Sequence, residues 1–456
     1  PGHLPRRRVM PCDALRRRFR QVADRPAIIW RDRARLYRDL LDAWQAWDEF
    51  FERAALAPGT IVALEADHSP AAVSATLSLW QRGAIVVPMT TPSADWRAQV
   101  RRIAAVQATL SLHDDRSIDF IRADQVADHA LYGRLRAARR PGVVLFTSGA
   151  AGEPKGAVHD AAALLEQFAR PRQALRAAAF LLFDHVGGLF SWLYHLSSGG
   201  CLVCLADRAP DAVLATMARH SVESITTTPT FLRLVLAGAA HRRHDLSSLR
   251  MVSYGAEPMP GPLLRRLVEA LPGVKFVQSY GLTEAGILRT QSRAADSTWV
   301  RLGGGSAETR VVNGVLHVRT ATTMLGYLNA PSPVLPDGWL DTGDRVETDG
   351  EFVRVVGRRG DFINVGGRKV FPREIEAVIS ELDEVADVSV CGLPNPLTGA
   401  AVCARVRPSS AGDAAELPRR VRRHCAERLE RYQVPVRVEL VTELRSGPRG
   451  KRAAGE

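Results

Sequence analysis

The pattern of hydrophobic and polar positions divides the chain into three parts. Between about residues 25 and 290, short apolar runs such as Thr60–Glu65 alternate with segments that are apolar at helical spacing, such as Ser69–Arg82. This alternation predicts an α/β architecture with largely parallel sheets and covered faces. The other strands predicted here are Ala27–Trp30, Ala84–Val87, Val143–Phe146, Ala178–Phe183, Cys201–Leu205, Ser224–Thr227, Leu249–Tyr254 and Lys275–Ser279, and the other helices are Ala161–Phe168, Leu189–Leu196, Pro229–Ala237 and Gly261–Leu271.

After about residue 298 the pattern changes to short strands separated by polar turns. Asn313-Gly314 stands between the strand-like runs Thr309–Val312 and Val315–Arg319, and this dipeptide favours a tight hairpin. Asp349-Gly350 indicates a second hairpin. These features predict a small β-rich subdomain at about residues 298–356.

The C-terminal part mixes the two kinds of segment. Helices are predicted at Pro372–Leu382 and Leu417–Arg431, and strands at Ala386–Cys391, Ala401–Arg407 and Val436–Val441. The whole sequence therefore predicts a large N-terminal domain of parallel-rich αβ sheets with the β-rich subdomain (1–356), a hinge (357–361) and a small, mobile α+β C-terminal domain (362–456).

The composition of the chain bears on its partners and on its location in the cell. The net charge of +12 could suit nucleic acid, but the arginines are scattered along predicted helices without interleaved aromatic residues, so no nucleic-acid partner is expected. No apolar run approaches the roughly 18–20 residues of a membrane span, and no apolar segment follows Arg6–Arg8 as in a signal peptide. Six dispersed cysteines suit the cytoplasm. Cys201 and Cys204 lie in one predicted strand, which favours buried thiols over a zinc site.

Lysine is rare: only four of the 61 basic residues are lysine, and the others are arginine. Lys155 closes a glycine-rich loop, Leu145–Gly156, that follows a predicted strand. Glycines let the backbone approach a ligand closely, so that successive N–H groups can surround a polyphosphate. Pro154 before the lysine and Gly156 after it exclude a Walker A loop. The residues alone leave two interpretations, a phosphate-binding loop or an ordinary turn.

This loop resembles the phosphate loop of the adenylate-forming superfamily, which contains acyl-CoA synthetases, peptide-synthetase adenylation domains and luciferases. The usual form there is Thr-Ser-Gly-Ser/Thr-Thr-Gly-x-Pro-Lys-Gly. Ala150 and Ala151 replace two hydroxyl residues that usually help to hold the β- and γ-phosphates. The resemblance implies that ATP contacts Thr147, Ser148, Gly149, Gly152 and Lys155.

Further segments resemble motifs of the same superfamily in the same order. Ser279–Gly286 is similar to its Tyr-Gly-x-Thr-Glu motif, which implies that Tyr280 packs on the adenine, Thr283 binds the α-phosphate and Glu284 holds Mg²⁺. Ser253–Pro258 resembles the adenine-side loop. The other nucleotide-binding residues implied by these two segments are Gly255, Ala256, Glu257, Ser279 and Gly281.

The C-terminal third carries three more similar segments. Gly338–Asp344 resembles Gly-Trp-x-x-Thr-Gly-Asp, whose last aspartate, here Asp344, accepts from the ribose hydroxyls. Gly357–Gly367 resembles the hinge segment. In that segment Arg358 matches a ribose-contacting arginine, Gly360 stands where the family usually has Asp or Lys, and Gly366 and Gly367 match the acceptor channel. Leu444–Lys451 resembles the C-terminal Gly-Lys motif, which implies that Lys451 bridges the substrate carboxylate and the α-phosphate.

One catalytic candidate lies on the substrate side. His185, in the segment Phe183–Leu189 before a predicted helix, matches a residue that stands near the carboxylate and the acyl pocket in the family. The alternative is a structural imidazole that hydrogen-bonds at the entry of the helix.

The resemblance implies an ATP-dependent, Mg²⁺-dependent ligase. It would activate a carboxylic acid as an acyl-adenylate with release of pyrophosphate, and then transfer the acyl group to a thiol of coenzyme A or of a carrier-protein pantetheine arm. One alternative is an amide or N-acyl synthetase with a nitrogen nucleophile. Another is an inactive binding module with this fold, which Ala150 and Ala151 motivate.

Overall fold

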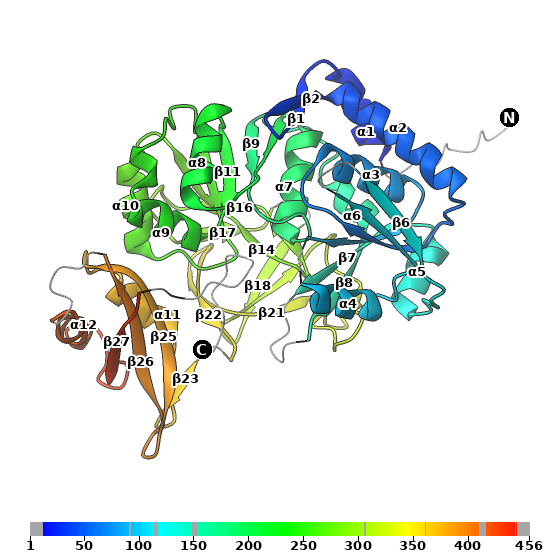
Figure 1. The fold of residues 1–456 in the computed structure, drawn as a ribbon. Coiled ribbons are helices and arrows are strands. Elements are labelled where there is room, and N and C mark those ends of the chain that lie inside the picture. The colour runs from blue at the N-terminus through cyan, green and yellow to red at the C-terminus, as the bar shows by residue number, and fades with distance from the viewer. Residues whose placement is uncertain are drawn as a thin grey trace.

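The structure is a computed structural model that describes residues 12–90, 93–113, 117–147, 153–304, 307–360, 362–409, 416–442 and 444. Within these ranges none of the helices combines the length and apolar character that a bilayer-spanning helix requires. Two large, mostly parallel sheets form the bulk of the molecule, and a smaller domain lies beneath them in Figure 1. The predicted α/β class is confirmed.

The first sheet has the strand order β13-β12-β11-β9-β10-β1-β2 and is parallel except for β2 at its edge. Its strands are β1 (Pro26–Trp30), β2 (Arg33–Leu36), β9 (Arg176–Ala179), β10 (Cys201–Cys204), β11 (Ser224–Thr227), β12 (Met251–Tyr254) and β13 (Lys275–Gln278). On its outer face lie α8 (Pro210–Arg219), α9 (Pro229–Ala237) and α10 (Gly261–Ala270), with the short η1 (Ala240–Arg242) after α9. Both cysteines of the C-x-x-C pair lie on β10, and burial raises the pKa of Cys201 to about 11.

The second sheet has the order β20-β8-β7-β4-β3-β5-β6, with a parallel centre β7-β4-β3-β5. Its strands are β3 (Ile61–Glu65), β4 (Ile85–Met89), β5 (Ala108–Leu112), β6 (Ile118–Arg122), β7 (Gly142–Thr147), β8 (Lys155–Asp160) and β20 (Gly326–Tyr327). Helices α4 (Ala94–Ile103) and α5 (Ala130–Ala138) cover its outer face.

A layer of helices fills the space between the two sheets. It contains α1 (Asp13–Gln21), α2 (Tyr37–Arg53), α3 (Pro70–Gln81), α6 (Ala161–Glu166) and α7 (Val186–Ser197). Neighbouring residues of one strand enter different cores: Leu202 of β10 packs against these central helices, whereas Val203 packs against the outer ones. Burial on both faces explains why the strands read as continuous apolar runs. Helices α1 and α2 were not predicted.

The β-rich subdomain is an antiparallel sheet with the order β16-β17-β22-β21-β19-β18. Its strands are β16 (Thr290–Ser292), β17 (Val300–Leu302), β18 (Glu308–Val312), β19 (Val315–Arg319), β21 (Leu340–Asp349) and β22 (Phe352–Arg358), and the hairpin β14 (Tyr280–Leu282)–β15 (Gly286–Leu288) packs against it. Asn313 and Gly314 form the predicted turn, both with positive φ. The second turn is Gly350-Glu351 rather than Asp349-Gly350, because Asp349 still pairs with Phe352.

The small domain follows β22. It consists of β23 (Ile363–Val365), β24 (Arg368–Val370), α11 (Pro372–Ile379), β25 (Val385–Asn395), β26 (Gly399–Pro408), α12 (Leu417–Ala426) and β27 (Arg437–Leu440). The two helices and the sheet share one core. Helix α12 ends earlier than predicted, at Ala426. In Figure 1 this orange-to-red domain lies below α9 and α10, and α9 contacts β25.

Candidate nucleotide-binding site

The two described ends of the glycine-rich loop belong to antiparallel strands, β7 and β8. Thr147, the last residue of β7, pairs with Lys155, the first residue of β8. The predicted helix at Ala161–Phe168 is present as α6, but β8, a strand that we did not predict, pairs with β7 and lies between the loop and this helix. Ser148, Gly149 and Gly152, together with Ala150 and Ala151, lie outside the described residues.

Asn329 ties down the base of this loop. Its side-chain oxygen accepts from the backbone N–H of Gly156 at 3.2 Å, and its amide nitrogen donates to the carbonyl of Pro154 at 2.9 Å. The Lys155 backbone between these two contacts is therefore held in place. Sequence reasoning missed Asn329, because an exposed asparagine carries no local signal for contacts with residues more than 170 positions earlier in the chain.

Tyr327 joins the lysine of the loop to the glutamate of the Tyr-Gly-x-Thr-Glu segment. It lies on β20, which pairs with β8, and its hydroxyl donates to Glu284 Oε1. The Nζ atom of Lys155 lies 5.8 Å from the centre of the Tyr327 ring. Burial and the neighbouring Glu284 raise the pKa of Tyr327, so the phenol remains a donor. Lys155 and Glu284 are thus brought together through a residue that the sequence did not single out.

Thr283 and Glu284 lie in the tight turn between β14 and β15. The Glu284 carbonyl accepts from Met324 N–H at 2.8 Å, and the Ala285 carbonyl accepts from the Thr322 hydroxyl at 2.7 Å. These bonds fix the turn to the segment that precedes β20. A single carboxylate beside a lysine matches the way Mg²⁺ is held in phosphate sites, where waters and the substrate supply the other ligands. Among the described residues no cluster of three metal-ligating side chains occurs.

Asp344 organises the second half of the site. Its Oδ2 accepts from the Tyr280 hydroxyl at 2.7 Å, and its Oδ1 accepts from Arg358 Nε at 2.9 Å. Burial, assisted by Asp344, raises the pKa of Tyr280 well above its usual value. A carboxylate has about four acceptor sites, so further donors such as ribose hydroxyls can still bind.

Arg358 connects the two halves. Burial lowers the pKa of its guanidinium, but Asp344 and, more weakly, Glu284 attract the charge, and the net effect is a raised pKa. Arg358 is bonded to Asp344, Asp344 is bonded to Tyr280, and Tyr280 begins the same β14–β15 hairpin whose turn carries Glu284. Lys155, Glu284, Tyr280, Asp344 and Arg358 consequently belong to one site.

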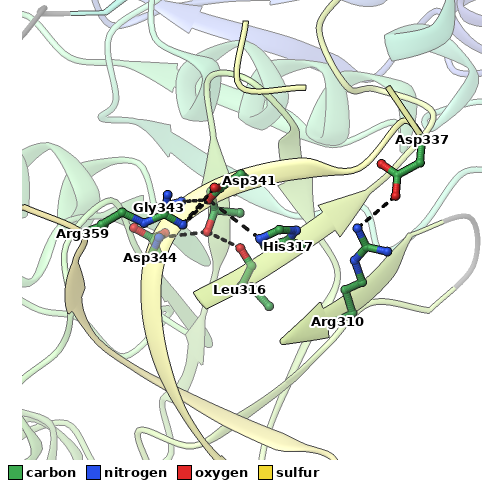
Figure 2. Close-up of polar contacts among 9 residues, drawn as sticks. Arg310, Leu316, His317, Asp337, Asp341, Gly343, Asp344 and Arg359 are labelled. Atoms are coloured by element: carbon green, nitrogen blue, oxygen red, sulfur yellow. Dashed lines mark hydrogen bonds and ion pairs between the residues drawn. The ribbon is translucent and has the colours of Figure 1, made fainter. Parts of the chain in front are cut away.

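Asp344 lies on β21, and Figure 2 shows the polar contacts around it. Thr342 donates to the Leu316 carbonyl at 2.7 Å and accepts from Asp344 N–H at 3.0 Å. Asp341 binds Arg359, whose Nη2 lies 2.9 Å from Oδ2, and the Arg359 N–H donates to the Gly343 carbonyl at 2.6 Å. One strand therefore fixes both arginines that precede Gly360.

The adenine-side loop follows β12. Gly255 is required by close packing, since a Cβ there would lie 2.7 Å from the Ser279 carbonyl oxygen. Ala256 has a φ of +67°, which is uncommon for a residue other than glycine and is typical of strained functional loops. Glu257 Oε2 accepts from the N–H and the hydroxyl of Thr230 at 3.2 and 2.7 Å. Gly281 lies on β14, opposite Ile287 of β15.

His185 occupies the N-cap of α7. Its Nδ1 accepts from the Gly187 N–H at 3.1 Å, so the neutral imidazole carries its proton on Nε2. This contact is the helix-entry hydrogen bond that we named as the structural alternative. The catalytic role of His185 stays a prediction.

The remaining candidates lie near or beyond the hinge. Gly360 has a φ of +98° and separates β22 from β23. Gly366 and Gly367 form the turn between β23 and β24, where φ is positive at both residues, so glycine is favoured by the turn itself. Lys451 lies outside the described residues.

The parallel-sheet fold and the carboxylates, arginine and loop lysine of this site are those that the resemblance to the adenylate-forming class implies. A profile of the AMP-binding enzymes matches residues 15–328, and one of the AMP-binding enzyme C-terminal domain matches residues 374–451. The chain belongs to the AMP-binding enzyme family, and the predicted resemblance is confirmed.

The relatives are consistent with this assignment. A feruloyl-CoA synthase of Amycolatopsis sp is 31% identical over 344 residues, which cover 69% of this chain and 68% of the relative. A 3-[(3aS,4S,7aS)-7a-methyl-1,5-dioxo-octahydro-1H-inden-4-yl]propanoyl:CoA ligase of Mycobacterium tuberculosis is 28% identical, with 96% of each chain covered. These relatives are ligases, so the predicted enzyme class, an acid–thiol ligase that forms an acyl-adenylate, is confirmed.

Solved structures share the fold. An anthranilate CoA ligase in complex with anthranoyl-AMP superposes with a TM-score of 0.83 at 21% identity, covering 97% of this chain and 95% of that one. An amide bond synthetase from Marinactinospora thermotolerans superposes with a TM-score of 0.74 at 24% identity, covering 97% and 98%.

Proposed function

We propose that the chain uses Mg²⁺ and ATP to convert a carboxylic acid into an acyl-adenylate and pyrophosphate, and then transfers the acyl group to the thiol of coenzyme A. The observation that supports this most is the single site formed by Lys155, Glu284, Tyr280, Asp344 and Arg358. Its cations suit phosphate oxygens and its buried carboxylate suits a ribose.

The residues divide the work between the ends of the nucleotide. Asp344 and Arg358 would hold the ribose, and Tyr280 would lie along the adenine with Gly255–Glu257. Lys155 would attract the phosphates, with Thr147, Ser148, Gly149 and Gly152 contributing donors from the loop. Thr283 would bind the α-phosphate. Glu284 would supply a carboxylate for Mg²⁺, which neutralises phosphate charge when bound.

Two residues are assigned to the reacting carboxylate. Lys451 would place its ammonium group between the carboxylate and the α-phosphate, and His185 would lie beside the acyl group. Most of the rate enhancement would come from positioning and fixed charge. Gly360 would act as the hinge between the domains, and Gly366 and Gly367 would line the path of the acceptor thiol.

Coenzyme A is the preferred acceptor because one relative, 31% identical, is a feruloyl-CoA synthase and another, 30% identical, is an indoleacetate–CoA ligase. A nitrogen nucleophile is the second candidate, because an amide bond synthetase has the same fold.

A carboxylic-acid panel scored by ATP-dependent pyrophosphate release identifies the substrate. Coenzyme A, a carrier protein and amines are then offered in turn, and the products are identified by mass. Absence of pyrophosphate release with every acid would instead favour the inactive binding module.

The role of Lys451 has its own test. Lys451→Ala is expected to slow acyl-adenylate formation by at least about 100-fold, in the range typical of a fixed charge at a reacting centre. Transfer from a supplied acyl-adenylate to coenzyme A should continue. An equal loss in both half-reactions would contradict the assignment.

A further inference from the structure

A shielded ion pair connects the two domains. Arg233 of α9, in the large domain, donates through Nη1 to Oδ1 of Asp387 on β25, in the small domain. Their side chains are only 14% and 10% exposed. Figure 1 shows the two elements facing one another, with β25 beneath α9. An exposed ion pair contributes little, whereas a shielded pair is costly to break when one partner is lost.

Asp387 has a second cation beside it. Arg407 is its direct partner across the antiparallel pair β25–β26, so the two side chains stand on the same face of the small-domain sheet. Over the ranges of the chain that the structure describes, Nη2 of Arg407 is buried and has no hydrogen-bond partner. Asp387 thus lies between one arginine of the large domain and one of its own domain, and it pairs with the first.

In the observed orientation, no described atom of the large domain lies within 4 Å of a Cβ placed at either glycine of the small-domain turn. A Cβ added at Gly367 would meet no described atom within 4 Å, and one at Gly366 would meet only Thr398 of the same domain. If this turn lines the acceptor path, the path is not assembled in this orientation. The orientation then corresponds to acyl-adenylate formation rather than acyl transfer.

We propose that Arg233 and Asp387 are positioning residues that hold the small domain for the first half-reaction, and that Asp387 exchanges Arg233 for Arg407 when the domain rotates for the second. This inference rests on the proposed two-step function. The exchange keeps the carboxylate paired in both orientations, which lowers the cost of leaving the first one.

Four variants of the full-length protein test the proposal: Arg233→Glu, Asp387→Arg, the double charge swap, and Arg407→Gln. Arg243→Glu is the matched control, because its partner Asp211 lies in the large domain and both side chains are more than half exposed. Hydrogen exchange of peptides from α9 and β25 reports the domain contact without any substrate. Pyrophosphate release and single-turnover transfer from a supplied acyl-adenylate report the two half-reactions.

Each single reversal should raise exchange at α9 and β25 and slow pyrophosphate release by about tenfold, while transfer is unchanged or faster. The charge swap is combined with Arg407→Gln, so that the new arginine at position 387 does not face a second arginine across the strand pair, and it should restore both exchange and pyrophosphate release to within about threefold. Arg407→Gln should leave pyrophosphate release intact and slow transfer by about threefold. Unchanged exchange in Arg233→Glu, or no rescue by the swap, would overturn the ion-pair role. An effect of Arg407→Gln on neither half-reaction would overturn the exchange of partners. A wild-type protein that protects α9 and β25 but releases no pyrophosphate with any acid would instead refute the proposed function.

Discussion

The hydrogen bond from Tyr280 to Asp344 allows a sharp test of the site. Tyr280→Phe removes one oxygen and keeps the buried ring. The hydroxyl donates to a carboxylate oxygen at 2.7 Å, and both residues are only 7% exposed, so water does not readily replace the donor. Hydrogen bonds to charged groups contribute about 1.5–3 kcal/mol, and this is the expected loss of unfolding free energy.

Tyr132→Phe is the control. Tyr132 is also buried, and its hydroxyl donates at 2.8 Å to a neutral acceptor, the carbonyl of Ala104. A hydrogen bond between neutral groups contributes about 0.5–1.5 kcal/mol, so Tyr132→Phe should lose about half as much unfolding free energy as Tyr280→Phe. Urea unfolding followed at several probes separates the transitions of the two domains.

The same variant tests the assignment of Asp344 to the ribose. If ribose hydroxyls donate to Asp344, they replace part of the hydrogen bonding that is lost with the phenol. The free-energy cost of Tyr280→Phe is then smaller in the AMP complex than in the free protein. Tyr280→Phe should therefore bind AMP as tightly as wild type or up to about tenfold more tightly. Calorimetric titration measures this. A loss of AMP affinity beyond about tenfold, or equal destabilisation by Tyr280→Phe and Tyr132→Phe, would refute the reasoning.

Three further outcomes follow from other contacts. Asn329→Ala removes both hydrogen bonds at the base of the glycine-rich loop. The ATP concentration for half-maximal pyrophosphate release should rise by about tenfold, and an unchanged concentration would show that these two bonds are not needed. Gly255→Ala should cost about 1–3 kcal/mol in urea unfolding because its Cβ would press on Ser279, whereas Gly133→Ala, in open space on α5, should stabilise. Burial lowers the pKa of His195 to about 4, below its value in the unfolded chain. The free energy of unfolding should therefore carry the full contribution of the neutral imidazole above about pH 6.5 and fall by up to about 3 kcal/mol toward pH 4. His195→Asn should reduce this fall when unfolding is measured as a function of pH.

The sequence predicted the parts of the fold that have a strong local signal. The buried strands of both sheets read as apolar runs because they are covered on two faces, and Asn313-Gly314 marked its hairpin by turn chemistry alone. The strand β8 was missed because its six residues, Lys155–Asp160, include a lysine, a histidine and an aspartate, so they do not form the apolar run by which the other buried strands were found. Helix α2 carries aromatic residues on its buried side and was overlooked between charged residues.

The site residues that stand in sequence motifs were predicted, and those that reach the site through contacts between distant segments were missed. Asp344 and Glu284 stand in recognisable segments, and the structure places each beside a tyrosine hydroxyl. Tyr327 and Asn329 contribute through contacts across more than 40 residues of sequence, which no local spacing reports. Gly255 was predicted as a nucleotide-binding residue, but the close approach of Ser279 already requires a glycine there.

Two adjacent arginines, Arg358 at the end of β22 and Arg359 directly after it, connect ribose recognition to the orientation of the small domain. Arg358 is bonded to Asp344, while Arg359, the residue before Gly360, is bonded to Asp341 and to the Gly343 backbone on the same strand. A ligand that binds Asp344 therefore also affects the direction of the chain segment that leads into the small domain. Because coupling between binding and orientation is reciprocal, compounds that occupy the ribose position should differ in the domain orientation that they favour, even when they carry no acyl group.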